Sequence, residues 1–314
     1  MRVLITGVAG FIGSRLAARL VADGAEVVGI DNLSAGLREN VPPAVRFHHE
    51  DIRSRGIVPL FECADAVIHL AAKNCLADCL ADPVETAEIN VAGTANVLEA
   101  ARRAGVRKLI YADTSAEYEG VFDFPSRVDR VAPLSVYARS KRAGAMFCEA
   151  YAEFYRLRTT VLRFFNVYGP AQDWRRTIPP LMSAFAIKLL RGERPVIYGS
   201  GEKRRDFVYI DDVVEFVVLA LKDARTDGGV YNVGSGVNHS VNEIFEQVEA
   251  ILETGLRPVH HDDLPGEAEI TLADIRNERA LGWEPRVGLR EGIERSIDYV
   301  REKVLGEGRR AGRR

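Results

Sequence analysis

The first residues of the chain constrain its fold more than any other segment. Residues 2–6 (RVLIT) form a short apolar run typical of a buried strand. Gly7, Gly10 and Gly13 follow at three-residue spacing and open an amphipathic segment that runs to about residue 22. A strand, a glycine turn and a helix in this order bring the backbone close to a pyrophosphate and aim the helix N-terminus at its charge. The sequence therefore predicts a dinucleotide-binding βα unit.

An acidic residue closes the next apolar run and bears on the choice of dinucleotide. The run 26–30 ends at Asp31, whose carboxylate can accept hydrogen bonds from an adenosine ribose diol. The same carboxylate would repel a 2′-phosphate, so the sequence favours NAD over NADP. Arg38 is the one nearby residue that would favour the phosphate.

Strand-like and helix-like segments alternate over most of the chain, which predicts an α/β fold with a doubly wound parallel sheet of Rossmann type. Strands are expected at 2–6, 26–30, 45–48, 66–70, 107–112, 159–164 and 230–233. Helices are expected at 12–22, 84–104, 134–156, 178–191, 212–222, 240–252 and 289–303.

Composition sets outer limits on function. The chain has 314 residues, 47% hydrophobic residues and a net charge of −3, which gives no sign of a nucleic-acid surface. It shows neither a signal peptide nor an apolar run long enough to span a membrane, so we expect a cytoplasmic enzyme. Cys75 and Cys79 lack a second ligand pair in the sequence, which favours reduced structural thiols over a metal site.

Tyr137 and Lys141 form the most informative chemical pair. They lie four residues apart in a helix-like run, which places a phenol and an ammonium on one helix face. A neighbouring cation favours the ionised phenol and lowers its pKa from the usual value of about 10. Such a tyrosine can exchange protons with a hydroxyl or ketone near neutral pH.

Ten segments in order carry a resemblance to a known family. The chain resembles the extended short-chain dehydrogenase/reductases, and within them the NAD-dependent nucleotide-sugar epimerases and dehydratases, most of all the UDP-hexose 4-epimerases. The segments are TGVAGFIG (6–13), DNLSAG (31–36), EDI (50–52), HLAA (69–72), NVAGTANVLEAA (90–101), YARSK (137–141), RFFNVYGP (163–170), RRDFVYIDD (204–212), YNVGSG (231–236) and LGWEP (281–285).

The resemblance implies two domains and a set of cofactor contacts. An NAD-binding domain would comprise residues 1–166 and 206–223, and a smaller α/β nucleotide-sugar-binding domain 167–205 and 224–304. Residues 305–314 form a Gly/Arg-rich tail that we expect to be disordered. The residues expected at NAD are Gly7, Gly10, Phe11, Ile12, Gly13, Asp31, Asn32, Ser34, Gly36, Asp51, Ile52, Leu70, Ala71, Ala72, Asn90, Tyr137, Lys141 and Phe164.

The loop after residue 112 decides the reaction type expected by resemblance. The register puts Ser115 in the catalytic hydroxyl position, with Thr114 as the alternative. Related dehydratases place Asp-Glu directly after a threonine, and related decarboxylases place Glu directly after the serine. This chain has Ser115-Ala116 after Thr114 and Ala116 after Ser115, so both diagnostic residues are missing, while Glu117 is displaced by one or two residues and Glu119 is a further extra carboxylate. We therefore expect C4 epimerisation, with dehydration, decarboxylation and reduction as alternatives.

The resulting hypothesis is a UDP-hexose 4-epimerase. Tyr137 takes the proton of the sugar 4-hydroxyl while hydride passes to NAD⁺, and the 4-keto sugar turns over before hydride returns. Lys141 holds the nicotinamide ribose, and Ser115 shares the O4 proton. The resemblance implies a homodimer through helices near 84–104 and 134–156. A binding-only NAD module is the alternative of another class, but such proteins commonly lack the Tyr or Lys that this chain retains.

Substrate contacts are likewise expected by resemblance. Asn166 corresponds to a residue that meets the sugar diphosphate, and Arg205 to one that clamps a phosphate. A second family arginine is replaced by Leu264, so that Arg257, His260 or His261 would have to substitute. Thr271 is small where bulk would exclude an N-acetyl group, which predicts that UDP-GlcNAc is accepted as well as UDP-glucose. Lys73 could instead favour an acidic sugar such as UDP-glucuronate, or be a solvent-facing loop residue.

Overall fold

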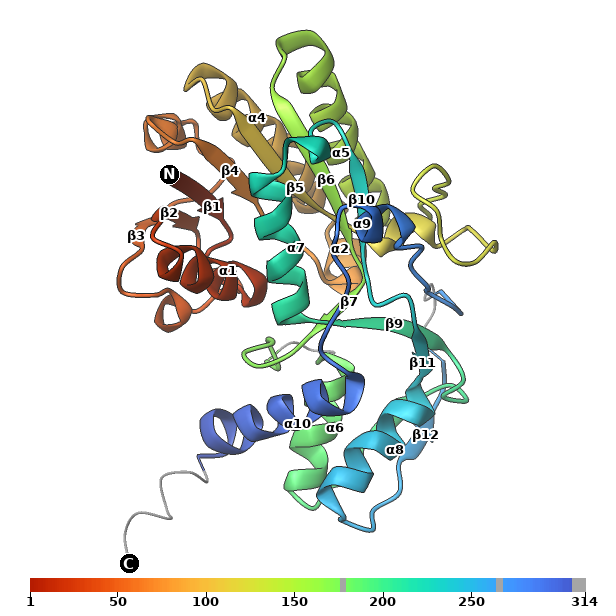
Figure 1. The fold of residues 1–314 in the computed structure, drawn as a ribbon. Helices are drawn as coiled ribbons and strands as arrows, with labels where there is room; N and C mark the ends of the chain where they lie inside the picture. The colour runs from red at the N-terminus through yellow and green to blue at the C-terminus, as the bar shows by residue number, and fades with distance from the viewer. Residues whose placement is uncertain (176–178, 264–267, 307–314) are drawn as a thin grey trace, which may run out of the picture.

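The chain is described by a computed structural model for residues 1–175, 179–263 and 268–306. Its centre is a seven-stranded parallel sheet with the strand order β10-β6-β5-β4-β1-β2-β3 (Figure 1). The strands are β1 (Arg2–Thr6), β2 (Glu26–Asp31), β3 (Arg46–His49), β4 (Ala66–His69), β5 (Lys108–Thr114), β6 (Arg158–Phe164) and β10 (Val230–Val233). This confirms the predicted doubly wound α/β fold.

Alternate residues of each strand pack against helices on opposite faces of the sheet. On β1, Val3 and Ile5 join the core beneath α1 (Phe11–Ala22) and α7 (Ile210–Lys222). Leu4, between them, joins the core beneath α4 (Thr94–Arg103) and α5 (Val136–Tyr155). Because both faces are covered, the central strands β1 and β4 are mainly apolar and buried, whereas the edge strand β3 (RFHH) is mostly polar.

The strand order reverses between β1 and β4, and this position defines where a ligand binds in such sheets. β2 and β3 lie on one side of β1, while β4, β5, β6 and β10 lie on the other. In open parallel sheets, ligands bind outside the carboxyl ends of the strands at this reversal. The fold therefore predicts a ligand site at the segments that follow Thr6 and His69.

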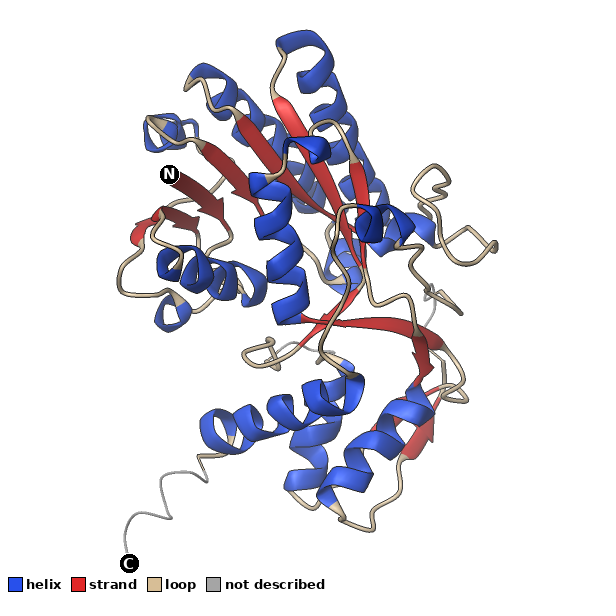
Figure 2. Cartoon of the chain, in the orientation of Figure 1, coloured by secondary structure: helices blue, strands red, loops and turns tan. Residues whose placement is uncertain are grey.

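A smaller part lies beyond the carboxyl edge of the sheet and is joined to it by several crossings of the chain (Figure 2). It contains a three-stranded sheet of β11 (Asn238–Ser240), β9 (Arg204–Tyr209) and β7 (Asn166–Tyr168), and a pair of β12 (Val259–His261) with β8 (Val196–Tyr198). Its helices are α6 (Leu181–Leu190), α8 (Val241–Leu252) and α10 (Leu289–Tyr299).

The predicted elements agree with the structure except at a few places. The expected helix 84–104 is an unbroken helical run from Pro83 to Arg103, in which α3 (Pro83–Ala87) continues through a π-helical stretch at Glu88–Gly93 into α4. The short helices α2 (Leu76–Ala81) and α9 (Arg276–Ala280) and the short strands β7, β8, β9, β11 and β12 were not predicted.

One strand differs from the predicted division of the chain. β10 lies within the range 224–304 expected in the sugar-binding part, yet it pairs with β6 as an edge of the large sheet. Its four residues are an apolar run interrupted by Asn232, whose buried side chain bonds the backbone of Ser126 and Asp274. The large sheet thus includes β10, a strand from the later part of the sequence.

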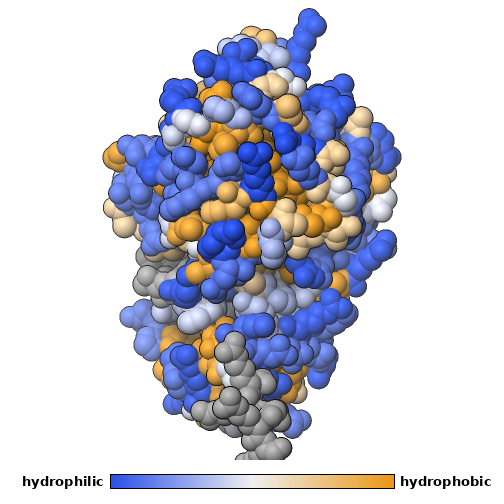
Figure 3. Space-filling view, turned by 90° about the vertical axis from the view of Figure 1, so that its left-hand side faces the viewer, coloured by the Kyte–Doolittle hydropathy of each residue, from blue (hydrophilic) through white to orange (hydrophobic). Residues whose placement is uncertain are grey.

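One side of the molecule combines apolar and polar surface (Figure 3). Figure 3 shows the side on which β3 and α1 lie in Figure 1, where apolar residues collect at the centre and polar residues surround them. No helix among the described residues is long and apolar enough to cross a membrane.

Candidate active site

The glycine turn after β1 leaves no room for a side chain. Gly7 has a φ of +73°, and a Cβ there would lie 2.8 Å from the amide nitrogen of Ala71. A Cβ on Gly13 would lie 2.1 Å from the carbonyl oxygen of Gly7. The turn thus packs tightly against the segment after β4, as a backbone cradle for a pyrophosphate requires.

The N-terminus of α1 is open to an anion. Gly10 is the N-cap, no side chain caps the helix, and its first turn carries no acidic residue. Phe11 and Ile12 begin this turn, so their amides point out of the glycine loop at the positive end of the helix dipole. Gly10 and Phe11 also line a small cavity with Ala35 and with residues 171–175 of the smaller part, where Arg175 donates to the Ala35 carbonyl at 2.7 Å.

The carboxyl end of β2 carries the predicted ribose-binding residue. Asp31 is buried, and its carboxylate accepts hydrogen bonds from the amides of Ala9 (2.9 Å) and Leu33 (2.8 Å). Asn32 and Ser34 follow in the same loop, where the Asn32 amide oxygen accepts from the Ser34 nitrogen at 3.0 Å. Gly36 packs against the backbone of Ala9, so this loop closes over the glycine turn.

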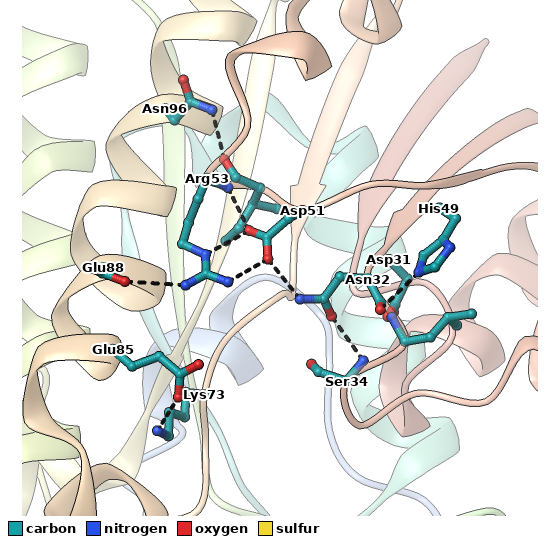
Figure 4. A network of polar contacts seen from close by, with 12 residues as sticks. Asp31, Asn32, Ser34, His49, Asp51, Arg53, Lys73, Glu85, Glu88 and Asn96 are labelled. Atoms are coloured by element: carbon teal, nitrogen blue, oxygen red, sulfur yellow. Dashed lines mark hydrogen bonds and ion pairs between the residues drawn. The ribbon is translucent and has the colours of Figure 1, made fainter.

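A polar network connects this loop to the segment after β3 (Figure 4). Asp51 accepts from the Asn32 amide (2.9 Å) and forms an ion pair with Arg53 (2.8 Å). The hydrogen bonds from Arg53 lower the pKa of Asp51 to about 2. Ile52 follows Asp51 and is buried, and its carbonyl accepts from Asn96 at 2.7 Å. The predicted cofactor residues of both loops therefore form one connected wall.

A buried histidine at the end of β4, which the sequence analysis did not single out, fixes the loop that follows. His69 lies between the hydroxyls of Thr6 (2.7 Å) and Thr94 (3.0 Å). Burial, and then the charge of Lys141, lowers the pKa of His69 to about 3, so the ring is neutral. Thr6 also accepts from the Ala71 amide at 3.2 Å. This chain of contacts places Leu70 and Ala71 against the glycine turn, and Ala72 follows them in the same loop.

Asn90 ties three segments together. It lies in the π-helical turn, is buried, and its amide oxygen accepts from the Lys73 nitrogen at 2.8 Å. Its amide nitrogen donates to the Lys73 carbonyl and to the Ser140 hydroxyl, both at 2.9 Å. The side chain thus holds the loop after β4 against α5, which makes Asn90 a positioning residue.

The side chain of Lys73 has a protein partner. Its Nζ lies 2.6 Å from a carboxylate oxygen of Glu85 in α3, and this bond raises the pKa of Lys73. The Lys73 side chain is 16% exposed, against 44% for that of Glu85. Lys73 is therefore neither an unpaired loop lysine nor an uncompensated cation awaiting an acidic sugar.

Tyr137 and Lys141 lie in the first two turns of α5, which Ser135 caps by accepting from the Ala138 amide. Lys141 is buried, and its Nζ lies 4.1 Å from the centre of the Tyr111 ring. Burial lowers the pKa of Lys141 to about 8, and the nearby Asp113 carboxylate opposes this shift. Tyr137 is half-buried one turn earlier. The predicted pair thus lies on one helix at the carboxyl edge of the sheet.

Ser115 and Thr114 have different surroundings at the end of β5. Thr114 is the last residue of the strand, and its hydroxyl accepts from the Ala116 amide at 3.1 Å. Ser115 begins the following 3₁₀ turn (Ser115–Tyr118) and is half-buried. Thr114 therefore acts as a cap for the turn that carries Ser115.

The two extra carboxylates of this loop point in different directions. Glu117 is fully buried, and a carboxylate oxygen lies 2.8 Å from Nη2 of Arg163 in β6. Asp113 is buried beside them, 3.7 Å from Nε of Arg163. Burial, and then the neighbouring Asp113, raises the pKa of Glu117 to about 8. Burial likewise raises the pKa of Asp113. Glu119 instead accepts hydrogen bonds from the start of α5.

The predicted substrate residues meet in the smaller part. The Asn166 amide donates to the Thr271 hydroxyl at 3.3 Å and to the Asp206 carbonyl at 3.1 Å. Thr271 also accepts from the Asp206 amide at 3.1 Å. Arg205 lies next to Asp206 on β9 and contacts the carbonyls of Arg204 and Glu269.

The remaining predicted positions lie around this cluster. Phe164 is buried at the end of β6, two residues before Asn166. Arg257, His260 and His261 are exposed at or beside β12. Leu264 lies outside the described residues. Among the described residues, no group of three or more His, Cys, Asp or Glu side chains is placed to hold a metal ion.

Fold and site together define a dinucleotide-binding α/β enzyme with a tyrosine–lysine pair at the carboxyl edge of its sheet. The sequence pattern of the NAD dependent epimerase/dehydratase family matches residues 3–234. The chain belongs to this family, and its cofactor is NAD.

Three relatives illustrate the range of the family. A UDP-glucose 4-epimerase of Mycolicibacterium smegmatis is 36% identical over 314 residues, covering 96% of this chain and 99% of the relative. The crystal structure of UDP-glucose 4-epimerase from Thermotoga maritima with UDP-glucose has a TM-score of 0.94 and 35% identity, covering 97% of this chain and 100% of the other. A UDP-glucuronic acid 4-epimerase of Bacillus cereus, in complex with UDP-glucuronic acid and NAD, has a TM-score of 0.90 and 30% identity, covering 96% and 99%.

The residues present fit NAD. The glycine cradle that a Cβ at Gly7 or Gly13 would fill, together with the uncapped N-terminus of α1, suits the pyrophosphate. The Asp31 carboxylate, hydrogen-bonded on both oxygens by backbone amides, is held where a ribose diol can donate to it. The same negative charge disfavours the 2′-phosphate of NADP.

Proposed function

We propose that the chain is an NAD-dependent UDP-hexose 4-epimerase that acts on UDP-glucose and UDP-galactose and on their N-acetylamino counterparts. The observation that carries the proposal is the arrangement after β5 and on α5. A half-buried Ser115 and a half-buried Tyr137 lie at the same edge of the sheet, and the buried Lys141 lies one turn beyond Tyr137. Membership in the family and the similarity to UDP-glucose 4-epimerases support it.

Each residue has a role in moving or holding a proton. NAD⁺, when bound, supplies the hydride acceptor for the sugar C4 and later the hydride donor. The Tyr137 phenolate accepts the proton of the sugar O4–H, and the ammonium of Lys141 lowers the free energy of that phenolate. Ser115 donates a hydrogen bond to O4 and so stabilises the negative charge that develops on this oxygen when it loses its proton. After the sugar has turned over in the site, Tyr137 returns the proton to O4, and the hydride would return to the opposite face of C4, which completes the inversion.

The buried position of Glu117 favours epimerisation over dehydration or decarboxylation. Both alternatives need an additional carboxylate at the substrate. Glu117 has no exposed surface and is engaged with Arg163, while Glu119 is engaged with the start of α5. Epimerisation needs no acid or base beyond the tyrosine and the serine, which this chain supplies.

The choice of sugar is proposed from two positions. Thr271 is small and half-buried where it contacts Asn166, and a small side chain at this position supports acceptance of an N-acetyl group at C2. Lys73 is neutralised by Glu85, which disfavours UDP-glucuronate, because a uronic carboxylate would have to displace that partner. UDP-glucuronate 4-epimerisation is therefore the second candidate, with the related Bacillus cereus enzyme as its support.

We also propose that the enzyme is a homodimer and that it works in the cytoplasm. Large apolar side chains are exposed on one face of α5 and on the short helices beside it, namely Leu76, Leu80, Val84, Met146, Phe147 and Phe154. Pairing of this face with a second copy would bury them, and contiguous exposed apolar surface of this kind is typical of protein interfaces. Analytical ultracentrifugation tests this proposal, since a monomer at micromolar concentration would contradict it.

Proton NMR tests the proposed reaction. Purified protein is incubated with NAD⁺ and with UDP-glucose, UDP-GlcNAc or UDP-glucuronate in separate samples. Galacto-configured H4 signals from the first two substrates support the proposal. Conversion of UDP-glucuronate alone would move the assignment to the second candidate, and loss of carbon dioxide or of water from the sugar would exclude epimerisation.

A further inference from the structure

A carboxylate outside the reacting groups joins the two segments that carry them. Glu119 follows the turn of Ser115, while Ser135 is the N-cap of the helix that carries Tyr137. One Glu119 oxygen accepts from the amides of Ser135 (2.7 Å) and Leu134 (3.1 Å). The other accepts from the Ser135 hydroxyl at 2.8 Å.

The contact is built into the start of the helix. The Ser135 hydroxyl donates to Glu119 and simultaneously accepts from the Ala138 amide at 3.0 Å, so one hydroxyl connects the carboxylate to the first turn. Tyr137 is the second residue of that turn. A negative charge at this end of a helix is also favoured by the helix dipole. The carboxylate therefore orients the turn in which the phenol is anchored.

Backbone bonds place Glu119 within a clamp between the two segments. The Ala132 amide donates to the Glu117 carbonyl at 2.8 Å, and the Gly120 amide donates to the Ala132 carbonyl at 2.9 Å. These bonds hold the chain before α5 alongside the 3₁₀ turn. The side chain of Glu119 adds a direct contact to the helix itself, because its carboxylate binds the N-cap residue Ser135.

We propose that Glu119 is a positioning residue that fixes Tyr137 relative to Ser115 by holding the first turn of α5 against the loop after β5. The inference rests on the proposed 4-epimerase activity, in which both hydroxyls must meet the same sugar oxygen. A displacement of a reacting group by about 1 Å can lower the rate about 100-fold.

The test compares variants that remove the carboxylate in graded ways. Glu119→Ala removes all three contacts, and we expect kcat to fall about 10- to 100-fold while KM for the UDP-sugar changes less than about two-fold. Glu119→Gln keeps an oxygen acceptor for the two amides but loses the acceptor of the Ser135 hydroxyl, so kcat should fall less than in the alanine variant. Hydrogen exchange of residues 134–142 should quicken in the same order.

Two control variants separate positioning from general loss of structure. Asp123→Ala removes an exposed carboxylate of the same loop, which pairs with Arg130 at 2.7 Å, and should leave kcat unchanged. Ser240→Ala breaks the capping box of α8, remote from Tyr137 in the fold, and should lower stability without lowering kcat. A decrease of kcat in the second control as large as in Glu119→Ala would overturn the inference.

The inference and the proposed function fail in different ways. If wild-type protein epimerises a UDP-hexose and Glu119→Ala retains its kcat within two-fold, the inference is wrong and the function stands. If wild-type protein epimerises none of the substrates, the proposed function is wrong. Unchanged hydrogen exchange of residues 134–142 in Glu119→Ala overturns the clamp in either case.

Discussion

The buried cluster beneath the active site predicts an unusual dependence of stability on pH. Glu117 and Asp113 are two buried carboxyl groups beside the guanidinium of Arg163, and the Lys141 ammonium also lowers the pKa of Asp113. Further groups face this cluster. Lys141 and Arg142 lie on α5, Tyr111 lies on β5, and Tyr118 lies in the 3₁₀ turn after β5. Full ionisation of both carboxyl groups is unfavourable there, so the native state retains a proton on Glu117.

The sign and size follow from the pKa of Glu117. It rises from its ordinary value of 4.5 to about 8 in the folded protein. One pKa unit corresponds to about 1.4 kcal/mol, so folding favours the protonated form by about 5 kcal/mol. The raised pKa means that the native state binds this proton more tightly than the unfolded state does. The stabilisation that the protonated Glu117 gives to the fold is therefore complete below about pH 4.5. It decreases as pH rises and is lost above about pH 8.

Glu117→Gln tests this reasoning, because glutamine resembles the protonated acid and does not titrate. We expect the variant and the wild-type protein to be about equally stable near pH 5. The variant should be more stable by about 3 kcal/mol near pH 7 and by about 5 kcal/mol above pH 8. Urea unfolding followed by circular dichroism at each pH measures the free energy of unfolding. Glu153→Gln, an exposed change on α5, is the matched control and should show no such trend.

A difference between wild type and Glu117→Gln that is constant with pH would refute the argument. So would a variant that loses stability relative to wild type as pH rises. Either result would mean that Glu117 is ionised in the native state and that its ion pair with Arg163 outweighs the cost of burial.

Three further changes test the proposed chemistry. Tyr137→Phe removes the proton acceptor and should lower kcat by about 10²- to 10⁴-fold, with UDP-sugar binding retained in isothermal titration calorimetry; near-normal turnover would exclude the scheme. Lys141→Met removes a cation whose pKa of about 8 keeps it charged at neutral pH. The phenolate then forms at higher pH, so the rising limb of the kcat profile should move to higher pH, and an unmoved limb would argue against the pair. Glu85→Gln releases Lys73 from its partner and should lower KM for UDP-glucuronate about ten-fold, because a partly buried cation is then available to the uronic carboxylate; an unchanged KM would place Lys73 away from the sugar.

Local patterns in the sequence account for most of the fold. The glycine turn, the apolar strands and the helix periodicity are short-range signals, and they placed all seven strands of the large sheet within about two residues of their observed ends. The expected helix 84–104 agrees with the helical run from Pro83 to Arg103, but the sequence pattern does not reveal its π-helical stretch at Asn90. The pairing of β10 with β6 is a long-range contact that no local pattern encodes.

The site was less accessible to sequence reasoning, because its polar contacts join distant residues. The sequence showed that Glu117 and Glu119 were unusual but not where they point. Glu117 pairs with Arg163 on the neighbouring strand, and Glu119 reaches Ser135 on the following helix. The compensation of Lys73 by Glu85 depends on how α3 folds back. Each contact requires the fold before it can be inferred.

The central claim is that this chain inverts C4 of a UDP-hexose, and proton NMR of UDP-glucose with purified protein and NAD⁺ tests it most directly. The account predicts a growing galacto-configured H4 signal from UDP-glucose, a falling one from UDP-galactose until both samples reach the same mixture, and no change of either sample with Tyr137→Phe. Unchanged spectra of UDP-glucose and UDP-GlcNAc, with the cofactor bound, would contradict it.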